Sequence, residues 1–233
     1  MFLPSYLFPP VCFGCGTRQT PDFSGVLCPT CLAKWEREQA ATCRRCGRRF
    51  THCVCQQQDN VLARPYPIFS VAPYRRKSVA EQLVRAAKRS ASLPLFRFLA
   101  DALATRLLAA NVSVGKQTVI AYLPRSAKNR RREGQDQGAL LAQALGARLG
   151  CPVIACFDNR SRISQKKLGR EARFAHAARA LVARENILAV RGKHVILVDD
   201  VATSGAGFAV GYALLRQAGA ARVVCASIAK AGA

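Results

Sequence analysis

Residues 195–207 read VILVDDVATSGAG. Four apolar residues run directly into two acids, Asp199 and Asp200, and a turn of small residues containing Gly205 and Gly207 follows. A continuous apolar run of this length is typical of a buried strand in a parallel sheet. The stretch therefore predicts a strand, a tight turn and a helix, with two carboxylates at the carboxyl end of the strand.

Strand-like and helix-like segments alternate through the rest of residues 66–229. Strands are predicted at 66–74, 118–124, 151–157, 193–200 and 221–229. Helices are predicted at 78–89, 94–110, 138–150, 172–183 and 205–219. Ser78 and Glu81 have the spacing of a capping box, which supports the first of these helices. The alternation predicts an α/β fold, with a mostly parallel sheet covered by helices on both faces.

The amino-terminal part of the chain has a different composition. Eight of the eleven cysteines lie in residues 12–55, as three C-x2-C pairs and one C-x-C pair: Cys12 and Cys15, Cys28 and Cys31, Cys43 and Cys46, Cys53 and Cys55. Two close pairs can complete a tetrahedral zinc site. Repeated close pairing favours two structural zinc ions over the disulfide scaffold of a secreted protein.

The simplest assignment takes the cysteines in sequence order, with the first four on one zinc ion and the last four on the other. An interleaved assignment remains open, and His52 is an alternative ligand to Cys53. The polar stretch QQQDN at 56–60 is a candidate linker. We therefore expect a small zinc module over residues 1–58 and an α/β domain over residues 59–233.

The charge of the chain indicates polyanionic partners. Lys and Arg number 36 against 13 Asp and Glu, which gives a formal net charge of +23. We take five residues as candidates for single-stranded nucleic-acid binding: Arg85, Lys88, Arg130, Arg131 and Arg132. A solvated helix face is the alternative interpretation of such charge runs. Aromatic residues for base stacking are few, with Trp35, Phe50 and Tyr74 the nearby candidates.

Membrane and export segments are not expected from the sequence. No apolar run approaches the roughly 20 residues that a membrane-spanning helix needs. The apolar start of the chain lacks a basic region and contains Pro4, Pro9 and Pro10, which is unlike a signal peptide. We therefore expect a cytoplasmic protein.

The turn after the strand at 193–200 has the features of a phosphate site. Backbone N–H groups at a helix N-terminus, flanked by Gly205 and Gly207, can bind a phosphate. Two carboxylates would repel that phosphate unless they face ribose hydroxyls or a magnesium ion. The combination suggests a ribose 5-phosphate. The alternative is that the acids cap the helix and the glycines shape a structural turn. In either case we expect the acids to lie where the sheet opens to solvent.

The same residues resemble a known motif. VILVDDVATSGAG is similar to the motif with which type I phosphoribosyltransferases bind phosphoribosyl pyrophosphate (PRPP). The segments CFGCG, CPTC, CRRCG and CVC resemble the double zinc ribbon of the ComF family, and YLPRSAKNRRREGQDQGALLAQAL resembles the VPL…RRRGFNQ…LA segment of that family. The chain thus resembles ComF proteins, which join a zinc module to a phosphoribosyltransferase domain.

The resemblance implies roles for individual residues. Asp199 and Asp200 would be the catalytic acids on the ribose hydroxyls, and Pro124 and Arg125 would meet the pyrophosphate and its Mg²⁺. The 5-phosphate would lie in the turn made by Thr203, Ser204, Gly205, Ala206 and Gly207. The implied function is support of DNA uptake in natural competence, with single-stranded DNA and a DNA helicase as partners. Two alternatives remain open: a phosphoribosyltransferase of nucleotide metabolism, and a non-enzymatic nucleic-acid adaptor with a degenerate PRPP pocket.

Two positions and one segment depart from the expected patterns. Gly207 stands where the phosphate turn usually ends on a hydroxyl residue, and residues 133–137 read Glu-Gly-Gln-Asp-Gln instead of Arg-Gly-Phe-Asn-Gln. Thr203 stands where enzymes acting on 6-oxopurines carry an acid. The last departure argues against a 6-oxopurine acceptor, and the first two favour the adaptor.

Overall fold

The computed structural model describes residues 9–43, 50, 53, 66, 68–161 and 170–231, and only the backbone of residues 133 and 170–174. The expected domain boundary after residue 58 lies outside these ranges, as do Cys46, His52 and Cys55. None of the described helices is long and apolar enough to cross a membrane.

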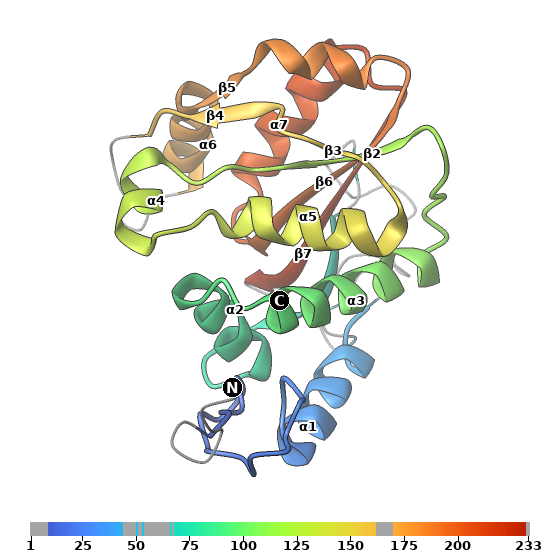
Figure 1. Ribbon diagram of the computed structural model, residues 1–233. Helices are drawn as coiled ribbons and strands as arrows, with labels where there is room; N and C mark the ends of the chain where they lie inside the picture. The colour runs from blue at the N-terminus through green and yellow to red at the C-terminus, as the bar shows by residue number, and fades with distance from the viewer. Residues whose placement is uncertain are drawn as a thin grey trace, which may run out of the picture.

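Five parallel strands form the central sheet (Figure 1). Their order across the sheet is β1-β7-β6-β2-β3, and their bounds are Ile68–Tyr74 for β1, Arg222–Ala231 for β7, His194–Ala202 for β6, Thr118–Tyr122 for β2 and Val153–Ile154 for β3. The predicted parallel sheet is confirmed. Tyr122 at the end of β2 pairs with Val198 of β6, so the chain leaves β2 directly beside Asp199 and Asp200.

Helices cover both faces of this sheet, as the sequence predicts (Figure 1). One face packs against α2 (Val79–Arg89), α3 (Leu93–Ala109) and α5 (Gln137–Leu149), with Leu83, Leu103 and Leu145 fully buried between the layers. The other face packs against α7 (Ala206–Gln217) and the 3₁₀ helix η3 (Glu185–Val190), through Phe208, Leu215 and Ile187. Helix α6 (Arg170–Ala180) lies against α7.

Two predicted elements are wrong in detail. The single strand expected over residues 151–157 is two strands, because a tight turn in which the Cys156 N–H donates to the Ile154 carbonyl redirects the chain. The second of them, β4 (Phe157–Asn159), pairs antiparallel with β5 (Leu181–Ala183). The helix expected over 172–183 therefore ends at Ala180, because the residues after it pair with β4.

The helix starts and ends that the sequence predicts agree more closely with those of the structure. Ser78 is the N-cap of α2, and its Oγ accepts a hydrogen bond from the Glu81 N–H at 3.0 Å. Glu81 completes a variant of the capping box, because its carboxylate accepts from the Lys77 N–H at 2.7 Å instead of from the N-cap residue. Gly150 ends α5 with a φ of 65°, a conformation that glycine adopts without strain.

The cysteine-rich segment shares its core with the α/β domain. It contains one described helix, α1 (Pro29–Ala40), which lies below α2 and α3 in Figure 1. Cys12, Leu27 and Trp35 belong to the same buried cluster as the residues of α2 and α3. Trp35 is 2% exposed, and its ring centroid lies 6.1 Å from that of Phe98 on α3.

A buried arginine fixes this segment to the sheet. Arg106 of α3 is 7% exposed and donates to three backbone carbonyls. The acceptors are Thr42 at 3.4 Å, Gln39 at 3.3 Å and Val71 of β1 at 2.7 Å. Since Gln39 and Thr42 flank the end of α1, one side chain joins that helix end to the first strand.

We predict that Arg106→Met lowers the free energy of unfolding by about 2–4 kcal/mol. Methionine keeps the apolar stem but leaves the Thr42 and Val71 carbonyls without this donor, which costs about 1–3 kcal/mol for each group, whereas the Gln39 carbonyl still accepts from the Thr42 N–H. Thermal denaturation followed by circular dichroism and by the fluorescence of Trp35, the one tryptophan of the chain, measures this change.

Arg148→Met is the matched control. Arg148 is 52% exposed on the side chain and pairs with the exposed Asp101 at 2.6 Å. A surface pair of this kind contributes roughly 0–1 kcal/mol. Equal melting temperatures for the two variants would contradict the role assigned to Arg106.

Candidate functional site

A cavity of about 500 Å³ opens beyond the carboxyl ends of β2 and β6. Its walls come from the end of α2, the loop after β2, α4 (Ala127–Glu133), the end of β6 and the start of α7. The nine residues expected at a PRPP site all line it: Pro124, Arg125, Asp199, Asp200, Thr203, Ser204, Gly205, Ala206 and Gly207. Segments far apart in the sequence thus meet at the sheet edge where ligands of α/β folds bind.

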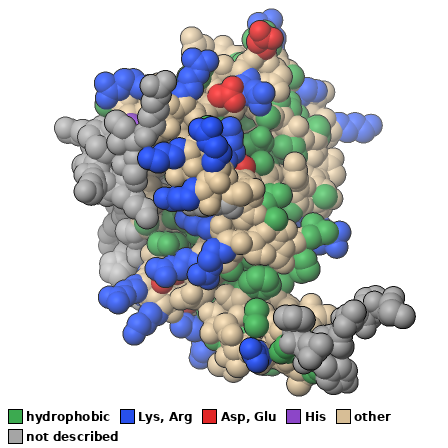
Figure 2. Space-filling model, turned by 60° about the vertical axis from the view of Figure 1, so that its left-hand side comes forward, with side chains coloured by type: hydrophobic (Ala, Val, Ile, Leu, Met, Phe, Trp, Pro, Cys, Tyr) green, Lys and Arg blue, Asp and Glu red, His purple; other side chains and the backbone are tan. Residues whose placement is uncertain are grey.

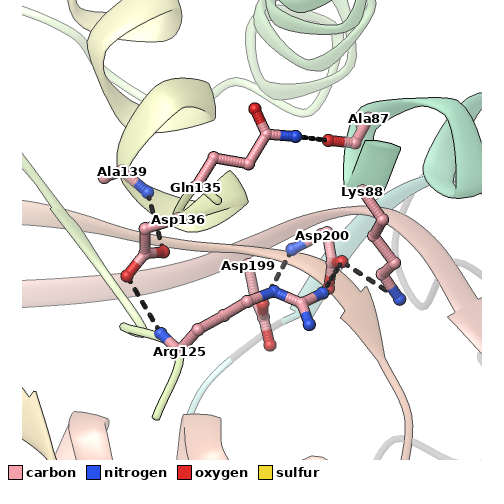
Figure 3. Close-up of polar contacts among 8 residues, drawn as sticks. All are labelled: Ala87, Lys88, Arg125, Gln135, Asp136, Ala139, Asp199 and Asp200. Carbon is pink, nitrogen blue, oxygen red and sulfur yellow. Dashed lines mark hydrogen bonds and ion pairs between the residues drawn. The ribbon is translucent and has the colours of Figure 1, made fainter. Parts of the chain in front are cut away.

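The two acids lie inside β6, which continues to Ala202, and they are held differently (Figure 3). The Asp199 carboxylate accepts from the Asp200 backbone N–H at 2.8 Å. The Asp200 carboxylate pairs with the guanidinium of Arg125 at 3.0 Å and with the Lys88 ammonium at 3.4 Å. The side chain of Asp200 is only 16% exposed. The expectation that the acids lie open to solvent is therefore wrong, because cationic side chains from α2 and from the loop after β2 cover this strand end.

These surroundings shift the pKa values of the two carboxyl groups in opposite directions. Burial, together with the negative charge of Asp200, raises the pKa of Asp199 well above its usual range. Burial also opposes ionisation of Asp200, but the charges of Lys88 and Arg125 outweigh it and lower the pKa of that group. Asp200 is thus the ionised member of the pair and Asp199 the member that retains a proton more readily.

Asp136 holds Arg125 in position. One carboxylate oxygen of Asp136 accepts from the Arg125 backbone N–H at 3.1 Å, and the other caps α5 by accepting from the Ala139 N–H at 3.4 Å (Figure 3). Next to it, the Gln135 amide donates to the Ala87 carbonyl of α2 at 2.6 Å. The segment that departs from the family pattern therefore ties α2 and the loop after β2 together. The sequence contained no signal for this role of Asp136.

The turn between β6 and α7 is shaped for close backbone approach. Gly205 has a φ of 76° and is the N-cap of α7, a conformation that favours glycine. The Ala206 N–H donates to the Ser204 hydroxyl at 3.3 Å. A Cβ atom on Gly207 would lie 3.0 Å from the Leu123 side chain. A residue larger than glycine at this position would therefore require a small shift of the Leu123 side chain.

The five nucleic-acid candidates do not share one environment. Lys88 and Arg132 line the cavity. Arg85 pairs with Glu81 at 2.8 Å, Arg130 lies 3.8 Å from Asp136, and Arg131 is exposed. Figure 2 shows Lys and Arg side chains in a band along the face on which α2 and α4 lie in Figure 1.

Four cysteines meet in the amino-terminal segment. The sulfur atoms of Cys12, Cys15, Cys28 and Cys31 all lie within 4.8 Å of one another, with Cys15 and Cys28 at 3.9 Å. Tetrahedral zinc with Zn–S bonds of about 2.3 Å places its sulfur ligands roughly 3.8 Å apart. The Cys12 sulfur also accepts from the Gly14 and Cys28 N–H groups at 3.3 and 3.2 Å. These four residues can hold a metal ion.

One further detail of this cluster fits a metal site. A Cβ atom on Gly14 would lie 2.9 Å from the Cys31 sulfur, so the turn leaves room for nothing larger than glycine. The thiols themselves differ: hydrogen bonds with Thr17 lower the pKa of Cys15 to about 6, whereas burial and the neighbouring cysteines raise the pKa of Cys31. Of the other four predicted ligands, Cys43 is buried and Cys53 half-buried, while Cys46 and Cys55 lie outside the described residues.

Comparison with known proteins gives a consistent result. Residues 135–233 match the phosphoribosyl transferase domain family. The chain is 29% identical over 211 residues to DNA utilization protein YhgH of Salmonella typhimurium, across 84% of this chain and 87% of that protein. It is similar to the structure of adenine phosphoribosyltransferase, with a TM-score of 0.39 and 19% identity over 60% of this chain and 71% of the other.

A second similar structure is that of the allosteric regulatory enzyme of purine biosynthesis. The TM-score is 0.36 and the identity 18%, over 64% of this chain. The match spans about a quarter (26%) of the length of that enzyme.

The acids and the phosphate turn lie in the matched residues 135–233. The four-cysteine cluster ahead of this region, and the similarity to YhgH over most of its length, agree with the ComF-like organisation that the sequence predicts.

We predict opposite effects on stability from neutralising the two acids. The raised pKa of Asp199 means that the native state binds its proton more tightly than the unfolded chain does. The charged group therefore destabilises the fold as pH rises above its unfolded value near 3.8. Asp199→Asn keeps the oxygen acceptor and removes that penalty, so it should raise the melting temperature at pH 7 by about 2–4 °C.

Asp200→Asn should lower the melting temperature by a similar amount at pH 7, because Arg125 and Lys88 lose the carboxylate that they share in a partly buried site. Thermal scans from pH 7 into acid well below 3.8 measure both effects. The Asp199→Asn difference should shrink as pH falls toward 3.8, where Asp199 is protonated in either state, and the Asp200→Asn difference should shrink only at lower pH, because the folded-state pKa of Asp200 is lowered. A lower melting temperature for Asp199→Asn at pH 7 would refute this account of the pair.

Proposed function

We propose that the cavity binds PRPP. The observation that carries this proposal is that all nine residues expected from the sequence line one cavity at the carboxyl edge of the sheet. The 5-phosphate would accept hydrogen bonds from the backbone of the turn at 203–207, at the N-terminus of the twelve-residue helix α7. The ribose hydroxyls would donate to Asp199 and Asp200.

The basic residues of the cavity would then change partners. When a ribose hydroxyl takes the place of a cation on Asp200, Arg125 and Lys88 become available for the pyrophosphate, and Arg132 lines the same cavity. Magnesium bound to the pyrophosphate would neutralise part of its charge. In a transfer reaction the bond from ribose C1 to pyrophosphate breaks, pyrophosphate leaves with the electron pair, and the acceptor bonds to C1. Cations held beside the leaving group stabilise that developing charge.

We propose further that this ComF-like protein acts in the cytoplasm in DNA uptake during natural competence, with single-stranded DNA and a DNA helicase as partners. The support is the net charge of +23 and the similarity to a DNA utilization protein. A phosphoribosyltransferase of nucleotide metabolism, with an acceptor other than a 6-oxopurine, is the second candidate, favoured by the retention of both acids in the cavity. A nucleic-acid adaptor with a degenerate pocket is the third candidate, favoured by Gly207 where the phosphate turn usually ends on a hydroxyl residue.

We also propose zinc as the metal of the cysteine cluster, with Cys43, Cys46, Cys53 and Cys55 as ligands of a second ion. Elemental analysis should find about two zinc ions per chain, and Cys31→Ser should remove about one, since it breaks a closed four-thiolate shell. Trp35 fluorescence should change with that loss, because Trp35 and Cys31 lie in one buried cluster.

Cys151→Ser is the matched control for this test. Cys151 is also buried but lies at the start of the segment before β3, outside the cluster. It should leave the zinc content unchanged. Zinc that persists in Cys31→Ser would remove this residue from the ligand set.

The PRPP proposal is tested by titration calorimetry with PRPP and magnesium. Replacing both acids, Asp199→Asn with Asp200→Asn, should weaken binding by roughly 10²-fold or more, because two charge-assisted hydrogen bonds of about 1.5–3 kcal/mol each are lost. The control is Asp101→Asn, an acid-to-amide change at a side chain that is 58% exposed on α3. The capping interpretation predicts unchanged affinity in the double variant, and that result would rule out a phosphoribosyl site here.

A further inference from the structure

A second cavity lies at the junction of the cysteine-rich segment and the α/β domain. Its volume is about 390 Å³, and its walls come from α1, the end of β1 and the turn that leads into α2. We call it the junction cleft. Its charged residues are five cations and one acid: Lys34, Arg37, Arg75, Arg76, Lys77 and Glu38. None of these residues belongs to the site described above.

The single acid does not neutralise the cations of the junction cleft. The two carboxylate oxygens of Glu38 accept from the Val79 N–H at 3.0 Å and the Ala80 N–H at 3.2 Å. Glu38 thus caps the first turn of α2, where its charge is directed at the positive end of the helix dipole. In the part of the chain that the structure describes, no ion pair involves the five cations, whereas Arg85, Lys88 and Arg125 each pair with an acid.

Hydrogen bonds to backbone carbonyls hold the turn at residues 75–78 in place. The hydroxyl of Ser78 donates to the Arg75 carbonyl at 2.7 Å, and the Lys34 ammonium donates to the Lys77 carbonyl at 3.0 Å. Lys77 has a φ of 63°, a left-handed conformation that is uncommon for a residue other than glycine. Three consecutive cationic residues are therefore presented by a fixed turn, opposite Lys34 and Arg37 on α1. Such an arrangement concentrates positive potential over a concave surface.

An exposed aromatic residue is joined through its backbone to the wall of the junction cleft. The Phe50 N–H donates to the carbonyl of Ala41, which lines the cleft, and Phe50 is 60% exposed. An exposed aromatic ring next to a basic groove is the combination with which proteins bind single strands, by stacking a base and neutralising the backbone. Of the two other aromatic candidates, Trp35 is buried and Tyr74 is half-buried.

We propose that the junction cleft binds the phosphodiester backbone of single-stranded DNA, with Phe50 as a stacking platform for a base. This inference rests on the proposed DNA binding and assigns it a site apart from the PRPP cavity. Helix α2 connects the two, with Ser78 in the junction cleft at its start and Lys88 in the PRPP cavity in its last turn. Its eleven residues span about 16 Å. Both sites lie at the same edge of the sheet, because β1, β2 and β6 are parallel and the cavities lie at their carboxyl ends.

The test measures binding of a labelled oligothymidylate by fluorescence anisotropy at several salt concentrations. Arg37→Glu with Arg76→Glu reverses two exposed cations of the junction cleft. The affinity should fall by roughly tenfold or more at low salt. The slope of log affinity against log salt should become shallower by about 1.4, since each phosphate contact with a single strand contributes about 0.7.

The control reverses the same number of charges at the opposite edge of the sheet. Lys116 and Arg222 are exposed next to the amino ends of β2 and β7. Lys116→Glu with Arg222→Glu should change affinity less than threefold and leave the salt slope unaltered. Equal losses in both double variants would mean that the whole basic surface binds, and would overturn the junction cleft as the site.

Variants of Phe50 provide an independent test of the stacking role. Phe50→Ala should weaken binding roughly tenfold with an unchanged salt slope, because stacking involves no phosphate, and Phe50→Trp should restore binding. Equal affinity of Phe50→Ala and the parent protein would overturn the stacking role. A preference for duplex DNA of the same length would overturn the assignment of a single strand.

PRPP calorimetry separates this inference from the proposed function. The junction-cleft double variant should bind PRPP as the parent protein does, because its residues lie outside that cavity. If the parent protein binds the oligonucleotide and the junction-cleft variants bind it equally well, the site is wrong and the proposed DNA binding stands. If the parent protein does not bind the oligonucleotide at all, both are wrong, whatever the outcome with PRPP.

Discussion

The contact of Asp200 with Arg125 and Lys88 organises the cavity at the carboxyl edge of the sheet. It joins the end of β6, the loop after β2 and the last turn of α2, which are far apart in the sequence. Parallel strands bring the first two together, because Tyr122 and Val198 are in register and their chains leave the sheet side by side. The acids would repel each other in isolation. Arg125 and Lys88 stabilise the charge of Asp200 beside Asp199. Burial and the remaining repulsion between the two carboxylates raise the pKa of Asp199.

Local features of this site could be read from the sequence, and features that depend on tertiary contacts could not. The apolar run, the two acids and the glycine turn are adjacent in the chain, so their geometry follows from one strand and one helix start. Lys88 was predicted to be a nucleic-acid residue. Its place in the cavity could not be predicted, because only the fold brings the end of α2 there. Asp136 gave no signal, since its hydrogen bond to the Arg125 N–H depends on how α5 meets the loop after β2. The strand expected at 151–157 divides at a turn that the apolar pattern does not encode.

The amino-terminal segment could be recognised by its cysteines, but its relation to the α/β domain required the structure. Arg106 and Glu38 join α1 to β1 and to the first turn of α2, and neither residue is distinctive in sequence. Arg106 and Glu38 both bond to backbone groups. The position of α1 therefore does not depend on the side chains of the residues that they contact. The cysteine cluster fixes the other end of that segment, because Cys31 lies in α1 and Cys12 belongs to the same buried core. One wall of the junction cleft is thus positioned from both ends of its helix.

Two adjacent acids in a chain of charge +23 can make the cavity more selective among phosphate ligands than a purely basic cavity would be. A site lined only by cations and helix N–H groups would bind any phosphate, including free phosphate and nucleic acid. In the proposed site, Asp199 and Asp200 would repel an anion that offers no hydroxyl or metal ion at that position, and they would accept hydrogen bonds from a ribose. Binding of such a ligand to Asp200 would free Arg125 and Lys88 from the carboxylate that they share, so that they could contact the negative charge of the ligand. The combination favours a molecule with hydroxyls and phosphates together, and the junction cleft, with Glu38 engaged by the start of α2, has no such requirement.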